Sequence, residues 1–132
     1  MLFVTFLVAL SLIASETAAG ASIGGSISSS PSGATLSYNA SELNNDRGVA
    51  EFTIRDTRAD GYCAWAKATF EIDRSPDSNV TASVCGSGYR RAFSLSGWAH
   101  SPVTQIRRLR VTVCRQLKGV LSGCTTRTIG AL

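Results

Sequence analysis

The amino-acid sequence predicts an all-β fold, a small antiparallel β-sandwich of about seven strands with two disulfides, each within one hairpin. Apolar and polar residues alternate with period two from Ala34 onward, which is typical of strands with one buried face. Clusters of glycine, asparagine, aspartate and serine separate the alternating segments, and no stretch has a sustained helical period. An open β-barrel is the alternative architecture.

The clearest alternation predicts a strand over residues 62–72. There Ala64, Ala66 and Phe70 share the face that we expect to be buried, and Trp65 lies on the opposite face with mostly polar neighbours. Shorter alternating segments predict further strands near residues 36–38, 49–55, 80–84, 93–98, 108–114 and 125–129.

The spacing of the four cysteines predicts their pairing. Facing residues in an antiparallel hairpin have a constant sum of residue numbers, and bridged cysteines must project from the same face. A hairpin that joins Cys63 to Cys85 is centred on a predicted turn, and so is one that joins Cys114 to Cys124. We therefore favour these two disulfides over the other two connectivities. Structural zinc ligands stand closer together than these cysteines, so no metal is expected.

The beginning of the chain predicts export. An apolar run ends at Ile13, and small residues follow up to Ala19-Gly20-Ala21, a site of the kind that signal peptidase cleaves. No Lys or Arg precedes the run, which departs from the usual pattern. We expect a signal peptide over residues 1–21, a flexible Ser- and Gly-rich leader over 22–33, and the sandwich over 34–132. The mature protein is then secreted and extracellular, with no membrane span.

Charge is distributed unevenly along the chain. All acidic residues precede Val80, and eight basic residues follow it. This asymmetry favours an anionic partner, such as an acidic glycan or a cell-wall polymer. A solvated surface whose charge keeps the protein soluble explains the same count.

Six residues are candidates for contacts with such a partner. Arg108 and Arg110 are two apart on one predicted strand, so their side chains share a face. A tryptophan ring suits stacking on sugars or bases, and arginine suits carboxylate or phosphate. The full set is Trp98, His100, Arg90, Arg108, Arg110 and Arg115. Trp65, two residues from Cys63, is expected to cover a disulfide instead.

Catalytic patterns are sparse. His100 is the only histidine, and no G-x-S-x-G motif accompanies it, so we expect no enzyme activity and no cofactor. An inhibitor of an extracellular hydrolase, acting through residues 74–78 or 118–121, is the second hypothesis, and an enzyme with His100 as base is the third. Asn39 and Asn79 begin glycosylation sequons.

The segment 56–61 contains two carboxylates four residues apart and ends in glycine. It has some likeness to a calcium loop, but Arg58 stands where a third oxygen ligand is needed. Turns in which Asp56 and Asp60 accept backbone N–H groups explain the pattern better.

The stretch Asp56-Thr57-Arg58-Ala59-Asp60-Gly61-Tyr62-Cys63-Ala64, the Gly86-Ser87-Gly88 turn and the strand from Arg108 to Arg115 resemble a group of small secreted actinobacterial proteins. The resemblance covers roughly residues 49–124 and implies export and a β-sandwich. The group is mostly uncharacterised, so no activity is implied. Cys63-Ala64-Trp65 is also similar to the neocarzinostatin type of apoprotein, but those proteins are acidic and space their cysteines more tightly, so no ligand is carried over.

Overall fold

The computed structural model describes residues 23–99 and 104–130, which form eight β-strands and no helix. The predicted all-β class is confirmed, although the strand count is eight where about seven were expected. The strands are β1 (Ile23–Ser28), β2 (Ala34–Leu43), β3 (Arg47–Asp56), β4 (Cys63–Ile72), β5 (Ser78–Cys85), β6 (Arg90–Trp98), β7 (Ile106–Leu117) and β8 (Val120–Ile129). The predicted signal peptide and His100 lie outside the described residues.

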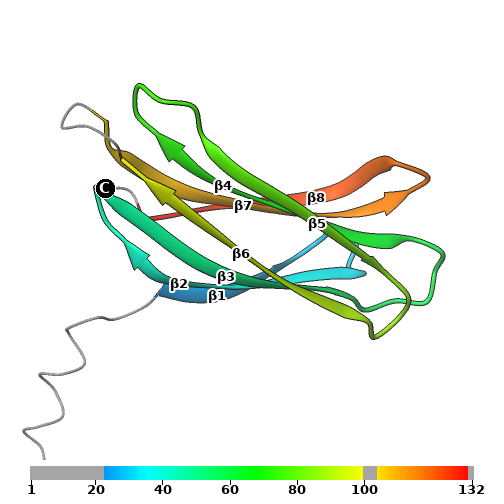
Figure 1. The fold of residues 1–132 in the computed structure, drawn as a ribbon. Coiled ribbons are helices and arrows are strands. Elements are labelled where there is room, and N and C mark those ends of the chain that lie inside the picture. Colours follow the sequence, from blue (N-terminus) through cyan, green and yellow to red (C-terminus); the bar gives the residue numbers. More distant parts are fainter. Residues whose placement is uncertain (1–22, 100–103, 131–132) are drawn as a thin grey trace, which may run out of the picture.

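The strands form two four-stranded antiparallel sheets that pack face to face, as Figure 1 shows. Sheet A has the order β1-β2-β3-β6, and sheet B has the order β5-β4-β7-β8. The predicted β-sandwich is therefore confirmed. No helix that could cross a membrane occurs in the part of the chain that the structure describes.

Strand β1 corrects the prediction of a leader over residues 22–33. It pairs with β2, with Ile27 opposite Leu36 and Gly25 opposite Tyr38, and Ile27 is buried. The alternation was hidden because the inward position between Ile23 and Ile27 is a glycine. A side chain at Gly25 would collide with the Tyr38 hydroxyl, since its Cβ would lie 2.5 Å from that oxygen.

The inward faces of both sheets form one hydrophobic core. Its largest fully buried aliphatic and aromatic side chains include Leu36, Ile54, Phe70, Leu109 and Val111. All five lie in segments that the period-two alternation predicted to be strands. The Phe70 ring fills space left by a pair of glycines on β3 and β6. A Cβ on Gly48 would lie 2.6 Å from that ring, and one on Gly97 would lie 3.1 Å from it.

Both predicted disulfides are confirmed, and both lie on sheet B. Cys63 faces Cys85 in the β4–β5 ladder, and Cys114 is bonded to Cys124 across the β7–β8 hairpin. Trp65 faces Cys114 across β4 and β7 and stands two residues from Cys63. Cys114 is fully buried although it lies on the outer side of the sheet, which agrees with the expected covering role of Trp65. Two disulfides fit an extracellular or otherwise oxidising environment.

Side-chain contacts join the two sheets along their lateral edges. On one side, the Arg127 guanidinium on β8 donates to the Tyr38 hydroxyl at 3.0 Å and to the Ser26 carbonyl at 3.3 Å. On the other side, the Ser78 hydroxyl on β5 donates to the Ser96 carbonyl on β6 at 3.1 Å. The edges of the sandwich are thus held by polar contacts, and its middle by apolar packing.

Candidate ligand-binding face

The six residues predicted to contact a partner do not form one site. Arg108 and Arg110 lie on β7 in sheet B, whereas Arg90 and Trp98 lie at the two ends of β6 in sheet A. Arg115 stands at the far end of β7, and His100 is outside the described residues. The surroundings of each arginine therefore decide whether its charge is available to a partner.

Arg108 and Arg110 share one carboxylate. The Arg108 Nε lies 3.1 Å from Glu71 Oε1, and the Arg110 Nη2 lies 2.6 Å from Glu71 Oε2. Glu71 reaches them because β4 pairs with β7, with Glu71 opposite Arg108. The acidic first part of the chain thus neutralises part of the basic second part, and the predicted basic face on β7 is weaker than its charge count suggests.

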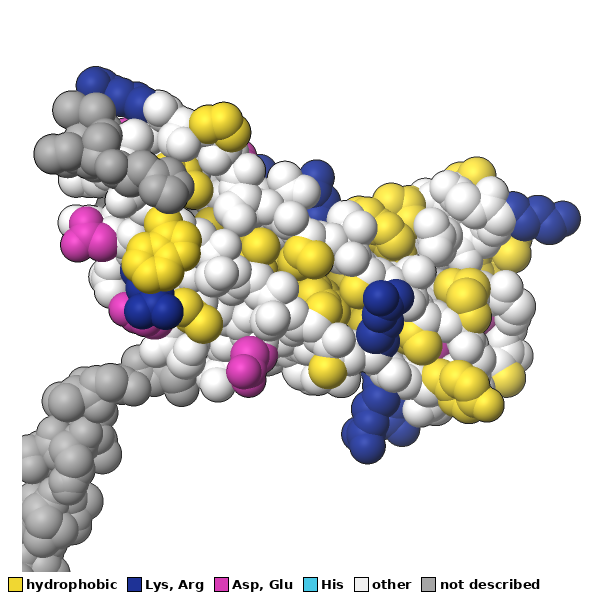
Figure 2. Space-filling model, viewed as in Figure 1, with side chains coloured by type: hydrophobic (Ala, Val, Ile, Leu, Met, Phe, Trp, Pro, Cys, Tyr) yellow, Lys and Arg dark blue, Asp and Glu magenta, His cyan; other side chains and the backbone are white. Residues whose placement is uncertain are grey.

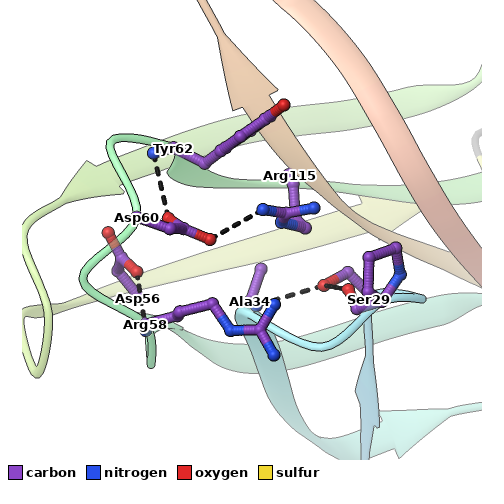
Figure 3. Close-up of polar contacts among 8 residues, drawn as sticks. Ser29, Ala34, Asp56, Arg58, Asp60, Tyr62 and Arg115 are labelled. Carbon is purple, nitrogen blue, oxygen red and sulfur yellow. Dashed lines mark hydrogen bonds and ion pairs between the residues drawn. The ribbon is translucent and has the colours of Figure 1, made fainter.

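Arg115 supports the fold rather than a ligand. Its Nη2 donates to Asp60 Oδ2 at 2.7 Å, and its Cζ lies 3.9 Å from the centroid of the Tyr62 ring. Its Nε is buried and has no hydrogen-bond partner. Figure 3 shows the guanidinium enclosed between the β3–β4 loop and the beginning of β2. The prediction that Arg115 takes part in a basic binding face is therefore not supported by its placement.

The segment around Asp60 forms the turns that the sequence indicated. The Asp56 carboxylate accepts the Arg58 backbone N–H at 3.1 Å, and the Asp60 carboxylate accepts the Tyr62 N–H at 3.0 Å. Gly61 adopts the left-handed conformation, with φ of 80°. Burial opposes ionisation of Asp60, but the Tyr62 N–H and the Arg115 and Arg58 guanidinium groups together hold the pKa of its carboxyl below the usual value.

No group of three or more His, Cys, Asp or Glu side chains suited to a metal ion occurs among residues 23–99 and 104–130. The hydrogen bonds of Asp56 and Asp60 account for their place in the segment.

Asp56 also fixes the turn between β5 and β6. Its buried side chain accepts the Gly86 N–H at 2.9 Å, and its backbone N–H donates to the Tyr89 carbonyl at 3.0 Å. Its own carbonyl accepts the Gly88 N–H at 2.7 Å. These bonds hold the end of β3 against the beginning of β6, where Arg55 and Arg90 stand opposite each other.

The outer side of the β3–β6 ladder is a row of five residue pairs. Neighbouring inward residues such as Ala50, Phe52 and Ile54 are buried, so these pairs point away from the core. From one end of the molecule to the other, the pairs are Arg55–Arg90, Thr53–Ala92, Glu51–Ser94, Val49–Ser96 and Arg47–Trp98. The row joins a cationic end, a centre of small or polar side chains and an aromatic end.

The cationic end is unusual because like charges face each other. Side chains directly opposite on neighbouring strands are about 5 Å apart at Cβ, and like charges there are destabilising. Neither Arg55 nor Arg90 forms an ion pair with a carboxylate in the described part of the chain. Arg55 was not among the sequence candidates, because only the pairing of β3 with β6 brings it to Arg90.

The centre of the row is hollowed into two adjoining shallow grooves of about 570 and 560 Å³, which share Glu51 and Ser94. One groove continues over β2, where Ser37 and Asn39 contribute to its wall. Both volumes lie within the range of small-molecule sites, roughly 300–1,000 Å³. Hydroxyl, amide and carboxylate groups dominate the outward side chains, so the grooves offer hydrogen-bond donors and acceptors.

The aromatic end exposes Trp98. This residue is 49 % exposed, and the Arg47 Cζ lies 4.5 Å from the centroid of its ring. Arg47 also forms an ion pair with Glu42 at 3.4 Å. Arg47 therefore orients the indole by a cation–π contact while much of the ring stays open for stacking.

No family model matches the chain, and no curated protein or solved structure is similar enough to indicate a relationship. The resemblances given above therefore stay predictions.

Each of the two segments considered for an inhibitor contains a tight turn. Arg74 has a left-handed φ of 58°, and Lys118 and Gly119 have φ values of 50° and 81° in the tight turn between β7 and β8. An inhibitory loop that enters a hydrolase cleft needs an extended backbone over several residues. Neither Arg74 nor the turn residues at 118–119 have that backbone.

Proposed function

We propose that this chain is a secreted, non-enzymatic domain that binds an extended acidic glycan along the outer face of β3 and β6. The unpaired Arg55–Arg90 pair is the observation that carries this proposal. Two facing guanidinium groups without a carboxylate cost folding free energy, and an anionic ligand that binds between them would remove that cost.

The rest of the row supports a glycan over a small anion. The ladder between the Arg55–Arg90 pair and the Arg47–Trp98 pair covers eight residue steps, about 27 Å at the usual rise of a strand. A chain with an acidic group at one end would place its hydroxyl groups beside Glu51, Ser94 and Asn39. A sugar ring would then stack on Trp98.

Glu51 in the middle of the row counts against a ligand with charge at every position. Its exposed carboxylate would repel closely spaced phosphates, as in nucleic acids, but it can accept hydrogen bonds from sugar hydroxyls. This favours a glycan that carries widely spaced carboxylate or sulfate groups.

Retention on immobilised polygalacturonate and heparin tests the proposal, with neutral dextran and single-stranded DNA as comparison matrices. The parent protein should bind an acidic glycan, release it as salt rises, and bind dextran and DNA more weakly. The R55A/R90A variant should bind at least about tenfold more weakly, because each charge-assisted hydrogen bond contributes roughly 1.5–3 kcal/mol.

The matched control is R108A/R110A, which removes the same number of arginines from the face where Glu71 already pairs with them. This variant should elute at nearly the parent salt concentration. Equal losses in the two double variants would mean that total charge alone drives retention. Stronger binding to DNA than to either acidic glycan would contradict the assignment to glycans.

A further inference from the structure

The tip of the β7–β8 hairpin exposes apolar side chains that the core does not use. The described part of the chain has six exposed large hydrophobic residues, and three of them, Leu117, Val120 and Leu121, lie at this tip. They are 39 %, 67 % and 38 % exposed. Pairing of β7 with β4 ends at Gln116, so Leu117 and the turn that follows extend beyond β4. Covering exposed apolar side chains of this kind with a protein or lipid surface lowers the free energy.

Basic residues occupy the same end of the sandwich as this tip. Lys118 occupies the turn itself, and exposed Arg55, Arg58 and Arg90 lie at the same end of the sandwich, where β3 ends and β6 begins. The acidic residues at that end are Asp56, which accepts backbone N–H groups, and Asp60, which is paired with Arg115. In Figure 2, hydrophobic and Lys or Arg side chains alternate over the right-hand end, whereas Asp and Glu side chains stand out mainly toward the left.

Tyr89 adds an aromatic residue to the same end. It lies in the turn between β5 and β6 and is 68 % exposed. Tyrosine is enriched where a protein meets the boundary between headgroups and acyl chains, because its ring is apolar and its hydroxyl is polar. Apolar, aromatic and cationic groups thus occupy one end of the molecule together.

We propose that this end docks on an anionic lipid surface, with Leu117, Val120 and Leu121 inserted among the headgroups. Charge complementarity favours a membrane as the occupant, since Lys118 lies in the tip, further cations lie at the same end of the sandwich, and the described carboxylates of that end are engaged within the protein. The small number of apolar groups agrees, because three large hydrophobic side chains are exposed at the described tip, whereas a stable protein interface takes about 20–30 residues a side. Three side chains of this kind beside several cations suit shallow, reversible binding.

Vesicle flotation tests this surface with the chain from Ser22 onward, which contains every described strand and lacks the apolar run before Ile13. The vesicles contain equal parts of phosphatidylglycerol and phosphatidylcholine, and pure phosphatidylcholine vesicles are the comparison. The parent protein should float with the anionic vesicles only. V120S/L121S should reduce binding about tenfold or more, and K118N, which keeps a residue tolerant of the turn conformation, about fivefold.

Two control variants at the opposite end keep the test specific. I23S removes an exposed aliphatic side chain, and R107Q removes a charge, so both should bind vesicles like the parent. Thermal unfolding of all variants checks that the sandwich is intact. Retention of V120S/L121S on an acidic glycan should be unchanged, which separates this surface from the β3–β6 face.

Three results would overturn the docking surface. The first is vesicle binding by V120S/L121S equal to that of the parent. The second is an equal loss in I23S. The third is a change of oligomeric state in V120S/L121S without vesicles, which would assign the tip to contact between two copies of the chain.

Discussion

The outer faces of the two sheets arrange charge and cross-links in opposite ways. Sheet B contains both disulfides, and its Arg108 and Arg110 share Glu71. Sheet A has no disulfide, and its Arg55 faces Arg90 with no carboxylate between them. The face with more basic residues in sequence therefore has part of its positive charge paired, whereas Arg55 and Arg90 have no carboxylate partner among the described residues. Pairing between strands, rather than the number of arginines, decides which surface can attract an anion.

Removal of a disulfide from sheet B should cause the largest change in stability among these variants. C63A/C85A should lower the free energy of unfolding by about 3 kcal/mol, because the bridge closes a loop with a sequence separation of 22 residues. Urea unfolding of the variant and parent under non-reducing conditions measures the loss. A loss below about 1 kcal/mol would mean that hairpin pairing alone holds sheet B and that the cross-link adds little.

The next largest effect is expected in acid, which should break the ion pair between Arg115 and Asp60 at the end of sheet B. The pKa of the Asp60 carboxyl is held below its usual value, so the ionised form stabilises the fold. This contribution is present above the usual pKa of about 3.9 and is lost as pH falls through the lower value of the folded state. D60N should therefore melt below the parent at neutral pH, and the two melting temperatures should converge in acid.

Melting curves followed by circular dichroism across the acid range measure this convergence. D73N is the control, since the exposed Asp73 carboxylate lies 4.0 Å from Arg107 and should change the pH profile little. Parent and D60N curves that stay parallel throughout the range would show that the Asp60–Arg115 pair does not supply the acid-sensitive stability.

The smallest expected effect is a gain in stability rather than a loss. R90T should raise the free energy of unfolding by about 0.2–1 kcal/mol, because it removes a like charge opposite Arg55 and places a β-branched residue in a strand. Added salt should reduce this gain, while acidic-glycan retention should fall. R110T on sheet B loses its ion pair with Glu71 and should not gain stability. A gain in R90T that does not depend on salt would point away from charge repulsion.

Period-two alternation and residue parity predicted most of the fold, because both follow directly from strand geometry. The pairing of Cys63 with Cys85 and of Cys114 with Cys124 was predicted since each hairpin is local in the chain. Strand β1 was missed because serine and glycine fill most of its positions, and the burial of Ile27 depends on pairing with β2. Local pattern alone does not reveal such a strand.

The candidate site was less predictable because it depends on pairing between distant strands. Arg90 and Trp98 were predicted as contact residues, and both lie on the β3–β6 face. Arg55 was missed, and Glu71 was not identified as the partner of Arg108 and Arg110, because neither the β3–β6 nor the β4–β7 register can be deduced from short turns. The register places Arg55 opposite Arg90 and Glu71 opposite Arg108, and this contact information is absent from the linear sequence.

The hydrogen bonds of Asp56 also bear on how this domain could acquire new specificities. Asp56 holds the junction of β3 with the turn before β6 through its buried carboxylate and its backbone groups, and the outward side chains of the row make none of these bonds. Thr53, Glu51 and Ser94 point outward and contribute nothing to that junction. Substitutions on the outer row can therefore change the chemistry of recognition while the frame persists. The sheet can serve as a scaffold for selecting binders of extended polymers.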